Sequence, residues 1–160
     1  TEIVRIGGRG IKACTACMQC FKHRNGACVQ GGDILNETVA KFAQVDGIIL
    51  GSPTWFASVS GDMKSFMDRA GFVAQANGAP LKRKPGAAVT AVRRGGAISC
   101  LDTMNHWLHY MQTYQVGSTY WNMVYGREPG EAENDAEGLK TMKNLGGNFL
   151  ALLQALAPRT

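Results

Sequence analysis

Short apolar runs alternate along this chain with longer stretches in which apolar residues recur every three or four positions. Residues 48–50 are apolar without polar interruption, and 86–92 are apolar except for Thr90, a pattern typical of parallel strands covered on both faces. Residues 2–6 have the β-branched composition of another short strand, and a brief strand is expected around Val116. The chain therefore contains several predicted strands, each separated from the next by room for a helix.

The intervening stretches show helical spacing of their apolar residues. We predict helices over residues 33–43, with Asp33 as N-cap, over 60–75, from the Gly95–Gly96 pair to about 114, and over 135–157. Parallel strands need a crossover of this length between them, and that crossover is usually a helix. The pattern predicts an α/β fold, a doubly wound parallel sheet in a single domain spanning residues 1–160.

Charge and hydropathy exclude two kinds of partner. The formal net charge is +5, but the basic residues are dispersed and are not interleaved with aromatic residues, so we expect no nucleic-acid partner. The apolar runs are far shorter than a bilayer span, so we expect no membrane partner either. With no apolar signal segment visible, the expected location is the cytoplasm.

Four cysteines near the start of the chain carry the strongest chemical signal. Cys14, Cys17, Cys20 and Cys28 have the spacing C-x₂-C-x₂-C-x₇-C. The nearest template is the ferredoxin run C-x₂-C-x₂-C-x₃-C, although the last gap is longer here and Val29, not proline, follows the fourth cysteine. The spacing favours these four residues as ligands of a cubic iron–sulfur cluster.

Three other interpretations of the motif remain open. A disulfide framework would need an oxidising compartment, and a chain of this length does not need such cross-links. Zinc prefers two C-x₂-C pairs separated by a long spacer, and a cysteine turn without metal can persist in a loop. Cys100 lies outside the motif beside Ile98 and Leu101, and is predicted to be a small buried apolar residue.

In a doubly wound sheet the ligand binds outside the carboxyl ends of the strands. The loops that follow these strands therefore lie together at one edge of the sheet. We therefore expect the cysteine loop and the loops at 52–58 and 93–96 at one edge. The first strand loop offers hydroxyls, N–H groups and aromatic faces for a planar heteroaromatic ligand, unless its rings simply cover the sheet edge. The second adds cationic donors and flexible backbone. The candidate ligand-contacting residues are Ser52, Pro53, Thr54, Trp55, Phe56, Ser58, Arg93, Arg94, Gly95 and Gly96.

Residues 46–56 (DGIILGSPTWF) and 58–69 (SVSGDMKSFMDR) resemble the flavodoxin-like NAD(P)H-dependent FMN reductase family. The upstream cysteine motif resembles that of its iron–sulfur flavoprotein branch. The resemblance implies a flavodoxin-like fold, FMN bound by the two loops, a [4Fe–4S] cluster on the four cysteines, and NAD(P)H as co-substrate. No catalytic side chain is expected, because the cofactor performs the chemistry.

One part of the family pattern does not appear before Thr1. Family members begin with a strand and a Gly/Ser/Arg-rich loop that holds the FMN phosphate at a helix N-terminus. No such segment precedes Thr1, and in the strand order 2-1-3-4-5 the absent strand would be central. We therefore expect about thirty to forty further residues ahead of the chain as given.

The leading functional hypothesis is an FMN-dependent oxidoreductase. NAD(P)H or a ferredoxin-type donor would reduce FMN, quinone-like or protein acceptors would be reduced in turn, and the cluster would relay single electrons. A non-enzymatic electron carrier and a metal-stapled structural domain with an empty flavin cleft remain as alternatives. The expected partner is a small molecule or a redox protein.

Three further groups of residues complete these expectations. Tyr120, Trp121 and Tyr125 form an aromatic cluster which, with the family resemblance, predicts a homodimer or homotetramer. Asp68 and Arg69 are expected to form structural ion pairs rather than to catalyse. The three histidines are expected at the surface or at helix ends.

Overall fold

The computed structural model describes residues 1–157, so the last three residues of the predicted domain lie outside the described part. The chain divides into two compact units. We call Thr1–Val45 with Ser60–Lys82 the cysteine unit, and Asp46–Val59 with the chain from Arg83 onward the sheet unit. A single domain stays a prediction. No helix in residues 1–157 is long and apolar enough to cross a membrane.

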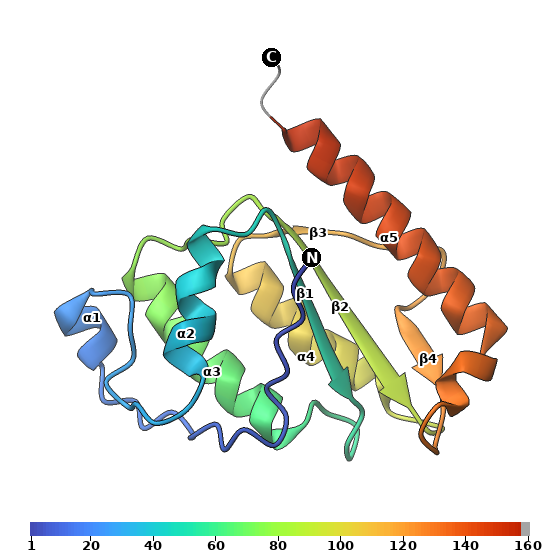
Figure 1. Cartoon of the computed structure of the whole chain (residues 1–160), viewed down its shortest axis with the longest axis horizontal. Coiled ribbons are helices and arrows are strands. Elements are labelled where there is room, and N and C mark those ends of the chain that lie inside the picture. The colour runs from blue at the N-terminus through green and yellow to red at the C-terminus, as the bar shows by residue number, and fades with distance from the viewer. Residues whose placement is uncertain (158–160) are drawn as a thin grey trace. The chain divides into compact units, whose positions relative to one another are not determined.

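The sheet unit is built on a parallel sheet with one central strand (Figure 1). Strand β2 (Pro85–Val92) pairs with β1 (Ile48–Pro53) on one side, in register from Ile48 opposite Gly86 to Pro53 opposite Ala91. On its other side it pairs with β3 (Tyr114–Gln115) and β4 (Met123–Tyr125). All these pairings are parallel, as the apolar runs without alternation predicted.

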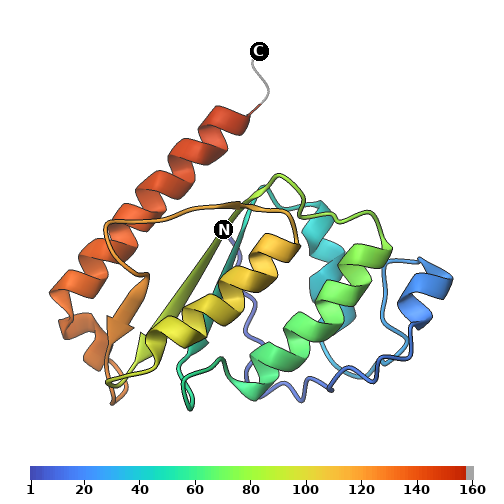
Figure 2. The ribbon, with the colours of Figure 1, turned by 180° about the vertical axis from the view of Figure 1, so that it is seen from behind.

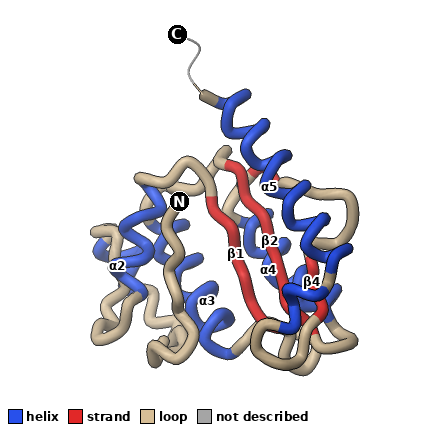
Figure 3. The backbone as a smooth tube through the Cα atoms, turned by 45° about the vertical axis from the view of Figure 1, so that its right-hand side comes forward, coloured by secondary structure: helices blue, strands red, loops and turns tan. Residues whose placement is uncertain are grey.

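The side chains of β2 alternate between the two faces of the sheet. A helix packs against the side chains on each face. Ala87 packs against Leu145 and Phe149 of α5 (Ala136–Leu156). Thr90, which points to the other face, lies 3.4 Å from Cys100 in α4 (Ala97–Tyr110). Figures 2 and 3 show these two helices on opposite sides of the sheet. The predicted doubly wound arrangement is therefore present around β2.

Strand β1 differs from the expectation of cover on both faces. Leu50 and Ser52 are buried, but Ile49, on the opposite face, is 51% exposed. The register places Ile49 beside Ala87, on the face that α5 covers. Helix α5 packs over β2 and β4 and does not cover β1, so Ile49 stays exposed on that face.

The segment after α4 also differs from the sequence prediction. The helix ends at Tyr110 rather than near residue 114, and Gln112 adopts a left-handed backbone conformation (φ 61°). The brief strand lies at Tyr114–Gln115. The long aromatic loop contains β4, which the sequence did not predict because three residues are too few to show periodicity.

Asp135 joins β4 to α5. Its carboxylate accepts hydrogen bonds from the Gly138 N–H at 2.9 Å, as the N-cap, and from the Tyr125 N–H at 2.8 Å. These donors lower the pKa of Asp135 against a weaker opposing effect of burial.

Asp135→Ala should destabilise the protein by about 1–2 kcal/mol, the usual cost of a lost N-cap. Because the folded-state pKa of Asp135 is lowered, its contribution is present above the unfolded pKa of about 3.9 and is lost as pH falls through the folded-state value. Urea unfolding at neutral and acid pH measures both effects. Asp135→Asn, which can still cap, should keep most stability at neutral pH, and an equal loss in both variants would contradict the capping role.

The cysteine unit consists of short helices packed on one long helix. Helix α3 (Gly61–Ala76) begins at Ser60, whose side chain accepts a hydrogen bond from the Met63 N–H. Helices α1 (Gln19–His23) and α2 (Leu35–Ala40) both contact α3, and the 3₁₀ turn η1 (Lys41–Ala43) extends α2. The buried residues of α3 are Met63, Phe66, Met67, Arg69, Ala70, Gly71, Val73 and Ala74.

The predicted strand at residues 2–6 is wrong. Within the described residues this segment forms no strand, and Ile3 is 95% exposed. Its composition suits a strand, but a strand exists only when a neighbour supplies the other half of its hydrogen bonds. An ion pair between Glu2 and Lys41 accompanies this extended segment.

Candidate functional site

The loop after β1 forms a tight turn that holds two aromatic rings away from the protein. Trp55 and Ser58 exchange both backbone hydrogen bonds, at 2.9 and 3.0 Å. Between them, Phe56 and Ala57 both adopt the left-handed conformation, with φ of 48° and 57°. Strain of this kind in non-glycine residues often accompanies functional sites. Trp55 is 62% exposed and Phe56 104%, which argues against the alternative that the rings cover the sheet edge.

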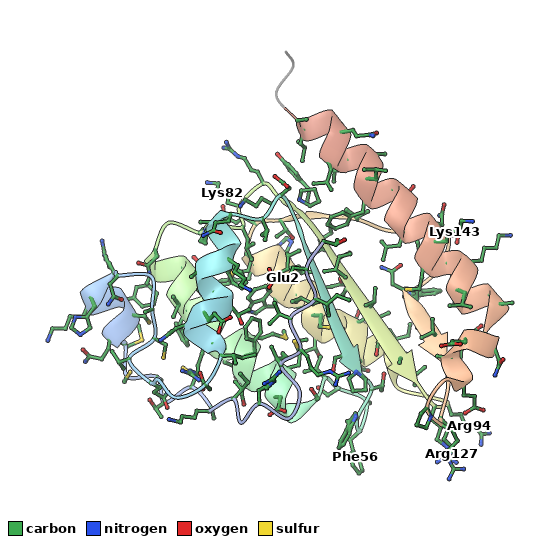
Figure 4. All side chains as sticks on the ribbon, viewed as in Figure 1. Glu2, Phe56, Lys82, Arg94, Arg127 and Lys143 are labelled. Atoms are coloured by element: carbon green, nitrogen blue, oxygen red, sulfur yellow. The ribbon has the colours of Figure 1, made fainter. Side chains whose placement is uncertain are left out.

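The second candidate loop, residues 93–96, meets this turn. Gly96, the N-cap of α4, has φ 89°, and a Cβ built on it would lie 2.9 Å from the Ala57 Cα. In Figure 4, Phe56, Arg94 and Arg127 lie at the end of the sheet to which the strand arrows point. The structure therefore brings the two predicted loops together at the carboxyl ends of β1 and β2, the edge where such sheets bind ligands.

If the two loops bind FMN, as the family resemblance implies, Gly96→Ala should weaken that binding, because the new methyl group would collide with the backbone of Ala57 and the residue would be strained at φ 89°. We expect about a tenfold higher dissociation constant, with FMN fluorescence quenching as the measurement. Gly95→Ala is the matched control, since nothing lies within 4 Å of its Cβ position. Equal affinities in the two variants would contradict the close approach of the loops.

A buried hydroxyl network holds the base of the turn. Thr90 Oγ1 donates a hydrogen bond to the Ser52 carbonyl at 2.7 Å. Its single proton is then used, so Thr54 Oγ1, 2.9 Å away, is the donor to Thr90. The Thr54 N–H bonds to the Ala91 carbonyl at 2.8 Å. Thr54 is thereby fixed to β2.

This network changes the role of one predicted residue and adds another. The side chain of Ser52 is buried and bonds to the Pro53 carbonyl at 2.9 Å, so it supports the loop from inside. Thr90 was missed, and the only sequence signal for it is a hydroxyl within an otherwise apolar strand. Cys100 is fully buried beneath this network, as predicted.

The cysteine motif surrounds a pocket in the cysteine unit. Cys14, Cys17, Cys20 and Cys28 all line it, and all carry free thiols. Ala16 and Met18, directly before and after Cys17, have left-handed φ values of 50° and 56°. Cys17 is exposed and Cys20 is buried; burial, with Cys28 and Cys17 nearby, raises the pKa of the Cys20 thiol. The other lining residues are Ala16, Met18, Val29, Gln30, Arg69, Phe72 and Val73.

The four cysteines line one pocket, but their side chains do not converge as ligands of a single metal ion. In residues 1–157, no group of three or more His, Cys, Asp or Glu side chains is arranged to hold a metal ion. A single zinc ion would need every thiolate within about 2.3 Å of its centre. The cavity itself is small, about 20 Å³, and it opens to solvent. The donor set is composed of thiols alone, which is the chemistry that iron–sulfur clusters require.

Arg69 also lines this pocket, although the sequence predicted only a structural ion pair for it. Its side chain and that of Asp33 are 0% and 1% exposed, and they form a buried ion pair. Against the opposing effect of burial, Arg69 lowers the pKa of Asp33, as do the N–H groups of Lys12 and Leu35. Burial also lowers the pKa of Arg69, but contacts with Asp33 and Cys28 raise it by more, so the pKa of Arg69 is raised. Structural ion pairing is confirmed for Arg69, and for Asp68, which pairs with Lys64 at 2.6 Å on the surface.

Comparison with known proteins identifies the family. Residues 1–128 match NADPH-dependent FMN reductase. The chain belongs to the NADPH-dependent FMN reductase family. It lies in the iron–sulfur flavoprotein branch, since it is 32% identical over 153 residues to an iron–sulfur flavoprotein of Methanocaldococcus jannaschii, covering 91% of this chain and 77% of the relative. A second iron–sulfur flavoprotein of that organism is 26% identical over 160 residues, covering 93% and 79%.

Solved structures support the fold of this FMN reductase family member. A WrbA-like flavodoxin of Agrobacterium tumefaciens superposes with a TM-score of 0.53 at 19% identity, covering 70% of this chain and 73% of the other. The Trp repressor binding protein of Bacillus subtilis gives 0.57 at 15% identity, covering 79% and 78%. The predicted flavodoxin-like α/β fold is confirmed, and family membership makes the protein an FMN flavoprotein.

Proposed function

We propose that this flavoprotein is an oxidoreductase in which NAD(P)H or a ferredoxin-type protein reduces FMN, and a [4Fe–4S] cluster on Cys14, Cys17, Cys20 and Cys28 relays single electrons. Quinone-like molecules or redox proteins are the proposed acceptors. The observation that carries the proposal is that four free thiols line one pocket in a chain of this family. When bound, FMN supplies both two-electron and one-electron chemistry.

The turn at residues 54–58 supplies the proposed contacts to the flavin ring. Trp55 and Phe56 present faces to which a planar ring can stack, because neither is buried in the protein. Arg93 and Arg94 add positive charge beside the turn, which favours an anionic ligand. The buried bond between Thr90 and Ser52 keeps the end of β1 rigid, so the turn keeps its position.

The cysteine pocket supplies the proposed cluster ligands. A cubic cluster takes one thiolate on each iron, and the four cysteines that line the pocket supply that number of ligands. The chain also lines the pocket with apolar groups, among them Phe72 and Val73. Such groups limit the entry of water to a bound cluster, which is one means of tuning its potential.

Metal and flavin analysis of anaerobically purified protein tests this proposal. We expect iron and acid-labile sulfide near four per chain, flavin near one per chain, and a brown colour. Protein without iron would refute the cluster, and protein without flavin would support the alternative of a structural domain. Steady oxidation of NADH or NADPH with added quinone distinguishes an enzyme from an electron carrier.

Trp55→Ala tests the ring site directly. Loss of one stacking face should weaken FMN binding by about 0.5–1.5 kcal/mol beyond the lost contact area. Titration of apo-protein with FMN measures the change. Tyr110→Ala is the matched control, because it removes an exposed ring at the far end of α4, about 20 Å along the helix from Gly96. Unchanged affinity in Trp55→Ala would assign that ring to another contact.

We also propose that the protein is a homodimer or homotetramer. Tyr120, Trp121 and Tyr125 are each about half exposed, and the rings of the first two pack edge to face at 4.6 Å. An exposed aromatic group of this size favours a contact surface. Light scattering across a wide concentration range tests the proposal, and a monomer mass throughout would refute it.

A further inference from the structure

We propose that Arg69 is a positioning residue for the metal group of the cysteine pocket: it donates an N–H···S hydrogen bond to Cys28 and places a buried positive charge there, which raises the reduction potential of the bound cluster. This inference rests on the proposed cluster. It concerns one side chain of α3 that lines the pocket but cannot itself be a ligand, because a guanidinium has no lone pair to offer.

The contact between Arg69 and the motif is direct. The Nε atom lies 3.4 Å from the Cys28 Sγ, within range for a hydrogen bond to sulfur. The side chain of Arg69 is fully buried, so water does not compete for this contact. Asn36 fixes the backbone of the same cysteine: its Oδ1 accepts from the Cys28 N–H at 2.8 Å, and its Nδ2 donates to the Cys28 carbonyl at 2.9 Å. The sulfur is therefore aimed at Arg69 by the surrounding chain.

The remaining donors of Arg69 hold the two ends of the cysteine loop. Nη1 donates to the Lys12 carbonyl at 3.3 Å, two residues before Cys14, and Nη2 donates to the Gln30 carbonyl, two residues after Cys28. Nη1 also pairs with Asp33. One guanidinium thus joins both ends of the loop, and its planar geometry leaves Nε directed at the sulfur.

The electrostatic consequence follows from this orientation. Reduction adds one negative charge to the cluster and its thiolates, and a hydrogen bond to sulfur stabilises the more negative state. Asp33 balances the guanidinium on its Nη1 side, whereas Nε faces Cys28, so the positive end of the pair is turned to the sulfur. Burial limits the screening of this interaction by water.

The decisive comparison uses two variants of α3. Arg69→Gln removes the buried charge, while Lys64→Gln removes a charge that is half exposed on the same helix. In each, iron and sulfide are counted, and the cluster's midpoint potential is measured by anaerobic titration with electron paramagnetic resonance. We expect Lys64→Gln to match the wild type. In Arg69→Gln the equilibrium constant for one-electron reduction of the cluster should fall about tenfold, which corresponds to a midpoint potential lower by about 59 mV.

A measurement on the wild-type protein avoids the risk that Arg69→Gln does not fold. With ¹⁵N-labelled arginine, pulsed electron paramagnetic resonance of the reduced cluster should detect a coupled ¹⁵N nucleus, as a direct N–H···S contact requires. Absence of that coupling, or a wild-type potential in folded Arg69→Gln, would overturn the role of Arg69 and leave the proposed function intact. Wild-type protein that binds no iron would overturn both, and iron analysis distinguishes these cases.

Discussion

Asp33→Ala is expected to lose about 3–5 kcal/mol of unfolding free energy, the usual cost of removing one partner of a buried ion pair. The substitution leaves the guanidinium of Arg69 buried without its counter-charge. It also removes the acceptor for the N–H groups of Lys12, at 3.1 Å, and Leu35, at 3.2 Å. Urea unfolding, followed by circular dichroism, measures the difference.

Asp68→Ala is the control for this experiment, because it breaks the exposed pair with Lys64 on the same helix. Exposed pairs contribute about 0–1 kcal/mol, so this variant should stay near the wild type. The effect of Asp33 also depends on pH. Its folded-state pKa is lowered, so its contribution is present above about 3.9 and disappears as pH falls through the folded-state value. Similar losses in both variants would contradict the buried pair.

Cys17→Ser is expected to abolish stoichiometric iron while leaving the fold intact. Cys17 is the exposed member of the four, so its loss removes a ligand without opening a buried cavity. Contacts from Arg69 and Asn36 hold the loop independently of this residue. Iron and sulfide analysis after anaerobic reconstitution, together with circular dichroism, checks both parts of the prediction.

Cys100→Ser provides the matched control. Cys100 is buried outside the motif, against Thr90 in the sheet unit, and should not affect iron content. If Cys17→Ser keeps wild-type iron, the four-cysteine cluster is wrong. If Cys100→Ser loses iron as well, the loss reflects general damage to the protein and not the removal of a ligand.

Periodicity was enough to predict the elements that bury a continuous apolar face. Strand β2 and helices α3 and α5 lie within one or two residues of their predicted bounds. Residues 2–6 had equally good composition, but a strand depends on a neighbour that composition does not report. The pairing of β4 with β2 was hidden for the same reason, since it depends on contacts between distant residues.

In the candidate sites too, some features follow from residue type and spacing, and others depend on contacts between distant residues. Residue type and spacing singled out four cysteines that line one pocket and two loops that meet in the structure, while their roles as ligands stay a prediction. Asp33 was predicted as the N-cap of a helix, but α2 begins at Leu35 and its N-cap is Ile34, so this prediction was wrong. Asp33 instead accepts from the Leu35 N–H and pairs with Arg69, and no local pattern reveals that pairing. One signal was available: Arg69 falls on the same face of the helix as Phe66 and Val73, where a charge needs a buried partner.

The guanidinium that joins Lys12 to Gln30 has a consequence for how a metal group is acquired and replaced. In small zinc domains the metal itself organises the chain, and its removal unfolds the protein. Here protein contacts already close the loop, so folding does not have to wait for the metal. Oxygen that destroyed an exposed cluster would leave a folded apo-protein with its thiols still grouped. If the proposed cluster is present, we expect iron and sulfide to restore it after synthesis or after oxidative damage, without passing through an unfolded state.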